Sequence, residues 1–358
     1  MRISLFIFFT LIASMVVGVV FGQIPAYYNN VNLTLTGQAL KNELANKITV
    51  THTNPITYND VWTVLQQTDL DPTNSTKVLL IYGYNDSDGN PTTDRTRNKN
   101  SNGGNIGDWN REHTYAQSLA TPNMTTSSPN AGTDAHHLRS SDVQMNGNRG
   151  NRLFATGSGN AGNAGVNWYP GDEWKGDVAR MMMYMYLRYD SQCLPNNVGV
   201  GTAVPTDANM IGLFLQWNAD DTVSVYEMNR NNLLQGIQGN RNPFIDNPYL
   251  ATIIWSGPIA QDKWNMTTSI RQLTDEIENY FTVYPNPTKE KIFVKFNEQH
   301  SASTNEQLYV YSVTGKLINQ FFSDDIQNNQ LEISLPQGLY ILKFKDNDAV
   351  FTKKVIVQ

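Results

Sequence analysis

The chain has 358 residues, which is enough for one large domain or for two smaller ones. Hydrophobic residues make up 40% of the sequence, which excludes wholesale disorder, and the net charge of −6 argues mildly against a nucleic-acid partner. Cys193 is the only cysteine, which excludes an intramolecular disulfide and a zinc site built on paired cysteines.

The first 22 residues have the pattern of a secretory signal peptide. Arg2 supplies a positive charge at the start, and small residues, Gly18 and Gly22, precede an expected cleavage point near Gln23. The apolar run between them is about 16 residues long, which is short for a membrane-spanning helix. We therefore expect an exported protein that loses residues 1–22. The alternative is an uncleaved membrane anchor.

The region from residue 24 to residue 265 is expected to mix helices and strands. Apolar spacing predicts helical structure over residues 35–70, 176–187 and 213–234, and a short apolar run predicts a strand over residues 77–83. Residues 134–154 are expected to run from a short strand into a helix. Polar, glycine-containing stretches predict loops over residues 85–107 and 121–133.

The composition changes near residue 265. Residues 266–278 are polar and acidic, as in a linker, and from residue 279 to residue 358 the hydrophobic period becomes two. Six short strands separated by turn residues indicate a small all-β sandwich there. The predicted strands cover residues 281–284, 291–296, 308–313, 331–335, 339–344 and 350–357.

Four motifs follow one another along this tail. They are Tyr284-Pro285-Asn286-Pro287, Val313-Thr314-Gly315-Lys316, Pro336-Gln337-Gly338-Leu339-Tyr340 and the terminal Lys353-Lys354-Val355-Ile356-Val357. In order and spacing the tail resembles the C-terminal sorting domain of type IX secretion cargo in Gram-negative bacteria. The resemblance implies recognition by the type IX secretion machinery and export through the periplasm and outer membrane. An ordinary carbohydrate-binding sandwich is the alternative.

Side chains capable of binding metal or phosphate concentrate between residues 95 and 152. This window holds seven basic residues against four acidic ones, inside an acidic chain, and three of the five histidines. A local excess of positive charge suits contacts with phosphate. The densest segments are Asn110-Arg111-Glu112-His113, Asp134-Ala135-His136-His137 and residues 142–152.

Phosphodiester hydrolysis needs a base that works near neutral pH and a hard cation held by oxygen ligands. His113 is the candidate base, and Glu112 and Asn146 supply a carboxylate and an amide oxygen for the cation. Arg149 is the first candidate for a bidentate phosphate contact. Neighbours on an extended strand point to opposite sides, so a bend is needed for Glu112 and His113 to serve one site.

Residues 110–118, 134–138, 146–151 and 175–185 resemble, in that order, the bacterial secreted endonuclease I family. The resemblance covers roughly residues 25–265. It implies an α+β fold in which a ββα-metal nuclease core is embedded in a mainly helical domain. It also implies cleavage of DNA, and often RNA, with little sequence preference and with 5'-phosphate ends.

The same resemblance assigns roles to individual residues. It implies that Glu112 and Asn146 hold one Mg²⁺ ion, with Ca²⁺ and Mn²⁺ as alternatives, and that His113 activates the water. It leaves the phosphate-binding arginine open, so Arg139 and Arg152 remain candidates after Arg149. Further candidates for a supporting role or a phosphate contact are Asp134, His136, His137 and Asn151, and Asn151 is also the rival of Asn146 as ligand. The chain departs from the family at Ala116, where proline is common, and at His137, where asparagine is common.

We therefore expect a secreted, monomeric, metal-dependent endonuclease whose substrates are DNA and RNA. One alternative is a non-catalytic cell-surface binding protein on a nuclease fold, but Glu112, His113 and Asn146 are all present. Another is a metallophosphoesterase for small phosphates, but the sequence lacks the Asp/His-rich clusters of two-metal sites.

Overall fold

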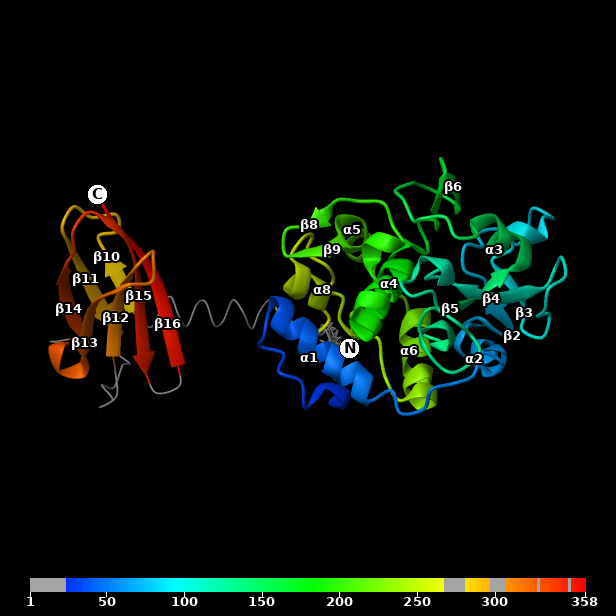
Figure 1. Ribbon diagram of the computed structural model, residues 1–358, viewed down its shortest axis with the longest axis horizontal. Coiled ribbons are helices and arrows are strands. Elements are labelled where there is room, and N and C mark those ends of the chain that lie inside the picture. Colours follow the sequence, from blue (N-terminus) through cyan, green and yellow to red (C-terminus); the bar gives the residue numbers. More distant parts are fainter. Residues whose placement is uncertain (1–23, 267–280, 297–306, 327–328, 347–348) are drawn as a thin grey trace, which may run out of the picture. The chain divides into compact units, whose positions relative to one another are not determined.

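The computed structural model describes residues 24–266, 281–296, 307–326, 329–346 and 349–358 (Figure 1). The predicted signal peptide and nearly all of the predicted linker lie outside the described residues. The chain divides into two units, the first ending at Trp264 and the second beginning at Asn265. Among the described residues, no helix has both the length and the apolar character needed to cross a membrane.

The described part of the first unit combines eight α-helices with several small sheets. The helices are α1 (Gly37–Val50), α2 (Asp60–Thr68), α3 (Val143–Arg149), α4 (Lys175–Tyr189), α5 (Gly212–Asp220), α6 (Val225–Gln238), α7 (Pro243–Asp246) and α8 (Tyr249–Trp255). The predicted helical stretch 213–234 is in fact two helices. Ser224 starts α6 with a capping box, in which its hydroxyl accepts from the Glu227 amide and the Glu227 carboxylate accepts from the Ser224 amide.

Helix α4 is the buried centre of the first unit. Every residue from 176 to 187 is buried, including four methionines. Helix α4 packs against α1 and α5 (Figure 1), and also against α7. Because α4 is surrounded on all sides, the few charged residues on it must find partners inside the protein. Arg180 does so through a bidentate pair with Glu227 of α6, at 2.6 and 2.8 Å.

The strands of the first unit are short and form four separate sheets among the described residues. They are β1 (Leu70–Asp71), β2 (Asn74–Leu79) and β3 (Thr96–Asn98) in one sheet, and the pairs β4 (Trp109–His113) with β5 (Leu138–Asp142), β6 (Gly162–Ala164) with β7 (Asn167–Tyr169), and β8 (Ala203–Val204) with β9 (Asp207–Ile211). The predicted strand 77–83 ends early, because the chain turns at residues 81–82, where Tyr82 has φ 72°. Strand β3 lies in the predicted loop 85–107.

The second unit is rich in β-structure and has one core. Its described strands are β10 (Phe281–Tyr284), β11 (Lys291–Phe296), β12 (Gln307–Ser312), β13 (Leu317–Phe322), β14 (Gln330–Ser334), β15 (Gly338–Asp346) and β16 (Ala349–Val357). They form a sheet in the order β10-β11-β14 and another in the order β13-β12-β15-β16, and buried side chains of both sheets make one hydrophobic cluster. The sequence did not predict β13. It is an edge strand whose apolar residues Leu317, Ile318 and Phe322 are exposed, so it lacks the alternating pattern.

Candidate active site

Strands β4 and β5 and helix α3 bring the predicted site residues together. The two strands pair antiparallel, with Glu112 opposite Arg139 and His113 opposite Leu138, and α3 follows β5 without a loop. Asp142, the last residue of β5, caps α3 by accepting from the amides at positions 144 and 145. Arg97 of β3 pairs with the other oxygen of Asp142 at 2.6 Å. This pair ties the start of α3 to the neighbouring sheet.

A cavity of about 310 Å³ lies where the end of β4 meets α3. Its lining residues come from β4, from the segment after it and from the end of α3: Arg111, Glu112, His113, Ala116, Gln117, Ser118, Asn146, Arg149, Gly150 and Asn151. The chain bends at residues 114–115, directly after the strand. Arg111, Glu112 and His113, three consecutive residues of β4, nevertheless line one cavity.

His113 is held with a defined pattern of donors and acceptors. Its Nε2 lies 2.8 Å from the backbone oxygen of Gly132. Because a carbonyl oxygen can only accept, Nε2 carries the proton and Nδ1 is the acceptor. The Gln117 amide nitrogen lies 2.8 Å from Nε2 and 3.2 Å from Nδ1, and only the contact with Nδ1 is a hydrogen bond when Nε2 carries the proton. Burial, followed by the nearby His137 ring, lowers the pKa of His113 to about 3, so the ring is neutral at physiological pH.

Glu112 is a buried carboxylate with two donors. Its Oε1 accepts from the Tyr82 hydroxyl at 3.0 Å and from Arg149 Nη1 at 3.1 Å. Burial raises the pKa of Glu112 to about 7, against the opposing effects of Arg149 and Tyr82. Sequence reasoning missed Tyr82, because it ends an apolar run and cannot be distinguished there from a core residue.

Asn146 is half-buried on α3, and its amide group has a defined orientation. Its Nδ2 donates to Oδ1 of Asn110 at 2.7 Å. The amide therefore presents its oxygen as the group that could hold a hard cation. Asn151, its rival in the sequence, also lines the cavity, but it is exposed and donates to the Ser118 hydroxyl at 3.3 Å.

Arg149 lies in the wall of the cavity and is almost wholly buried. Besides Glu112, it donates to the backbone oxygens of His113 and Thr114, each at 2.9 Å. Three of the five N–H groups of this guanidinium are thus used within the protein. Arg149 thus fixes the carboxylate of Glu112 and the backbone carbonyls of His113 and Thr114. A phosphate contact by Arg149 stays a prediction.

The other two candidate arginines do not line this cavity. Arg139 is 1% exposed and pairs with Asp177 at 3.2 Å and with Asp69 at 3.6 Å. It lies on the same face of the strand pair as Glu112, but its two carboxylate partners hold the guanidinium in the core, which does not fit the predicted phosphate contact. Arg152 donates to the backbone oxygen of Asn148.

Asp134, His136 and His137 are buried and do not line the cavity. Asp134 accepts from the hydroxyls of Tyr184 and Tyr189, at 2.8 and 2.9 Å. His136 lies by the side-chain oxygen of Asn240 and against the Tyr184 ring. His137 donates from Nε2 to the backbone oxygen of Ala131 at 2.8 Å, and its ring centre is 5.6 Å from that of His113.

The donor chemistry of the cavity suits one hard cation. Within the described ranges, no group of three or more His, Cys, Asp or Glu side chains could hold a metal ion. Glu112 and Asn146 provide one carboxylate and one amide oxygen. Such a set fits an ion like Mg²⁺, which keeps several water ligands and needs few from the protein.

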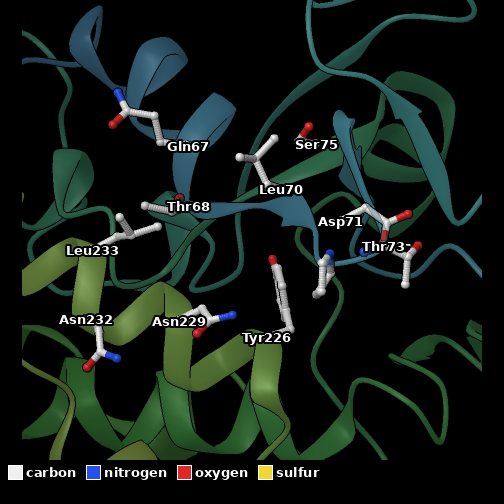
Figure 2. Close-up of a pocket in the computed structure, with 11 residues that line it drawn as sticks. Gln67, Thr68, Leu70, Asp71, Thr73, Ser75, Tyr226, Asn229, Asn232 and Leu233 are labelled. Atoms are coloured by element: carbon white, nitrogen blue, oxygen red, sulfur yellow. Dashed lines mark hydrogen bonds between the residues drawn. The ribbon is translucent and has the colours of Figure 1, made fainter.

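A second, larger cavity of about 600 Å³ lies between β1 and α6 (Figure 2). Its lining includes the side-chain amides of Asn229 and Asn232 on α6 and of Gln67 on α2. Its lining residues include one carboxylate, Asp71, and no histidine or arginine. It therefore lacks a histidine to act as base and a cation to contact phosphate.

Comparison with known proteins matches both units to families. Residues 36–249 match the family described as Endonuclease I, and residues 282–358 match the Secretion system C-terminal sorting domain. The chain is 41% identical over 233 residues to an extracellular ribonuclease of Bacillus subtilis (strain 168), covering 62% of this chain and 75% of that protein. It is 40% identical over 231 residues to an extracellular ribonuclease of Bacillus amyloliquefaciens, with the same coverage.

Proposed function

The chain belongs to the endonuclease I family, and from that premise we propose that His113 activates the water that cleaves nucleic-acid phosphodiester bonds. The enzyme is a nuclease, a phosphodiester hydrolase. Its C-terminal unit is a type IX sorting domain, so the protein is secreted or displayed at the cell surface. We further propose that β4, β5 and α3 are the two strands and the helix of a ββα-metal core.

The arrangement of His113 carries this proposal. Nε2 donates to the Gly132 oxygen, so Nδ1 can accept a proton from a water in the cavity. The Gln117 amide, which lies close to both ring nitrogens, would have to give way to that water. Because burial lowers the pKa of His113 to about 3, the ring would hold this proton only transiently, and the Gly132 carbonyl would stabilise its positive charge meanwhile.

Glu112 and Asn146 would hold one divalent cation, Mg²⁺ or, as alternatives, Ca²⁺ or Mn²⁺. When bound, such an ion supplies positive charge that offsets the negative charge developing on the phosphate. Tyr82 and Arg149 orient the carboxylate of Glu112, and Asn110 orients the amide of Asn146. These outer contacts fix the ligands before the substrate arrives.

We propose DNA and RNA as substrates, cut with little sequence preference to give 5'-phosphate ends. The two Bacillus relatives are extracellular ribonucleases, which supports the RNA part. The cavity side chains also favour contacts with the sugar–phosphate backbone, which every sequence shares.

The test is to incubate the secreted protein with supercoiled plasmid and with RNA, in Mg²⁺ or in EDTA. Cleavage is expected with Mg²⁺ only, and His113→Ala should lower its rate by about 10²-fold or more. Asn146→Ala should raise the Mg²⁺ concentration needed for half-maximal rate. Asn148→Ala, two residues along the same helix and outside the cavity lining, is the matched control.

Cleavage in EDTA equal to that in Mg²⁺ would contradict the metal requirement. Equal rates for His113→Ala and the wild type would contradict the assigned base. End-labelling of the products distinguishes 5'-phosphate from 5'-hydroxyl ends.

A further inference from the structure

Arg111 is a cation at the edge of the active-site cavity, and the sequence analysis did not name it among the candidate phosphate-binding arginines. Its guanidinium carbon lies 3.5 Å from the ring centre of Tyr58 and 4.0 Å from that of Trp62. Its Nη1 donates to the backbone oxygen of Tyr58. Two aromatic faces and one carbonyl thus hold the planar group in one place, while the side chain stays half-buried and lines the cavity.

The position of Arg111 on β4 sets it beside the base. Residues two apart on a strand point to the same side, so Arg111 and His113 share a face. The Tyr58 ring spans the two, because its centre is also 5.4 Å from that of the His113 ring. A phosphate contacted by Arg111 would therefore lie near the group that activates water.

The charge of Arg111 has no carboxylate partner among the described residues. Two arginines line the cavity, and Arg149 is paired with Glu112. Within the described ranges, Arg111 makes no ion pair with a carboxylate. A guanidinium with a fixed plane and no acidic partner, in a cavity for a polyanion, has the chemistry of a phosphate-binding group.

We propose that Arg111 binds a backbone phosphate of the nucleic-acid strand that crosses the cavity, with Tyr58 and Trp62 holding its guanidinium in place. This proposal rests on one part of the proposed function, namely that a nucleic acid is the substrate bound in this cavity. It makes Arg111 a substrate-binding residue.

Binding of a fluorescent single-stranded oligonucleotide, in EDTA and over a series of salt concentrations, tests this. The proteins are full-length His113→Ala and the same variant with Arg111→Gln, Arg111→Lys or Arg95→Gln. Arg95 is the matched control, because Glu173 neutralises it at 2.6 Å and it lies outside the cavity lining.

Arg111→Gln should raise Kd roughly tenfold and lower the slope of log Kd against log salt by about 0.7, the value for one phosphate contact on a single strand. Arg111→Lys keeps the charge and should keep most of the slope. Arg95→Gln should change neither quantity. A purely structural Arg111 would lower the melting temperature without changing the salt slope.

An unchanged slope in Arg111→Gln would overturn the proposal, and so would an equal change in Arg95→Gln or a lack of any oligonucleotide binding. Failure of the proposed function would be seen in a different experiment, as cleavage of nucleic acid by His113→Ala in Mg²⁺. The two outcomes come from different assays and can be told apart.

Discussion

The Nε2 atom of His113 lies 2.8 Å from the backbone oxygen of Gly132, 19 residues further along the chain. The neighbouring carbonyl, that of Ala131, accepts from His137 at the same distance. Two histidines thus hold two consecutive carbonyls of the 3-10 turn Ala131–Thr133. The orientation of the proposed base therefore depends on the fold of the long connection between β4 and β5.

Gly132→Ala should lower kcat by about tenfold to a hundredfold, because even a small misplacement of a catalytic group is costly. A Cβ at position 132 would collide with the backbone oxygen of Thr125, so the turn and its carbonyl must shift. Steady-state kinetics on plasmid measure the effect. Gly104→Ala, whose Cβ would meet no neighbour within 4 Å, is the control. An unchanged kcat in Gly132→Ala would show that this carbonyl does not position His113.

The Mg²⁺ concentration for half-maximal cleavage should rise about tenfold for each pH unit below 7. The pKa of Glu112 is raised to about 7 by burial, so protons compete with the metal at lower pH. The pKa of His113, about 3, is too low to contribute there. Rates measured over a range of Mg²⁺ concentrations at several pH values test this. A half-maximal concentration that does not change with pH would exclude Glu112 as the titrating ligand.

Tyr82→Phe should raise the half-maximal Mg²⁺ concentration about tenfold, as loss of a group that orients a metal ligand commonly does. The hydroxyl of Tyr82 donates to Glu112, and this hydrogen bond favours the charged carboxylate. Tyr27→Phe removes a hydroxyl that bonds Thr51 instead and serves as control. If Tyr82→Phe and Tyr27→Phe have the same half-maximal Mg²⁺ concentration, the Tyr82 hydroxyl has no role in metal binding.

Buried histidines should destabilise the first unit as the pH falls from about 6.5 towards 4, whereas Glu112, whose folded-state pKa is raised to about 7, acts in the opposite sense. Burial lowers the folded-state pKa of His136 and of His137 to about 4, from an ordinary value of 6.5. In this window only the unfolded chain takes up these protons, so each histidine lowers the free energy of unfolding by up to about 1.4 kcal/mol per pH unit.

Urea unfolding followed by tryptophan fluorescence measures this loss, because all seven tryptophans lie in the first unit. His137→Asn should make the loss of stability with falling pH shallower, since the proton that His137 takes up on unfolding is no longer involved. The same pH dependence in this variant and in the wild type would contradict the assignment.

Local sequence patterns predicted much of the secondary structure. The helix over residues 176–187 and the tail strands follow apolar spacing, because each buries one regular set of side chains. Apolar spacing did not predict the break between two helices or a strand whose apolar residues are exposed. The Ser224 capping box divides α5 from α6, and the edge strand β13 exposes its apolar residues.

The sequence by itself determined the family, the export signal in the tail and the concentration of Glu112, His113 and Asn146 in one region, because motif order and composition are properties of the chain alone. Only the tertiary structure decided what surrounds each side chain. It placed Arg139 between two buried carboxylates, Tyr82 on Glu112, and Arg111 in the cavity without a carboxylate partner among the described residues. Those environments depend on contacts between segments tens of residues apart, which local spacing does not encode.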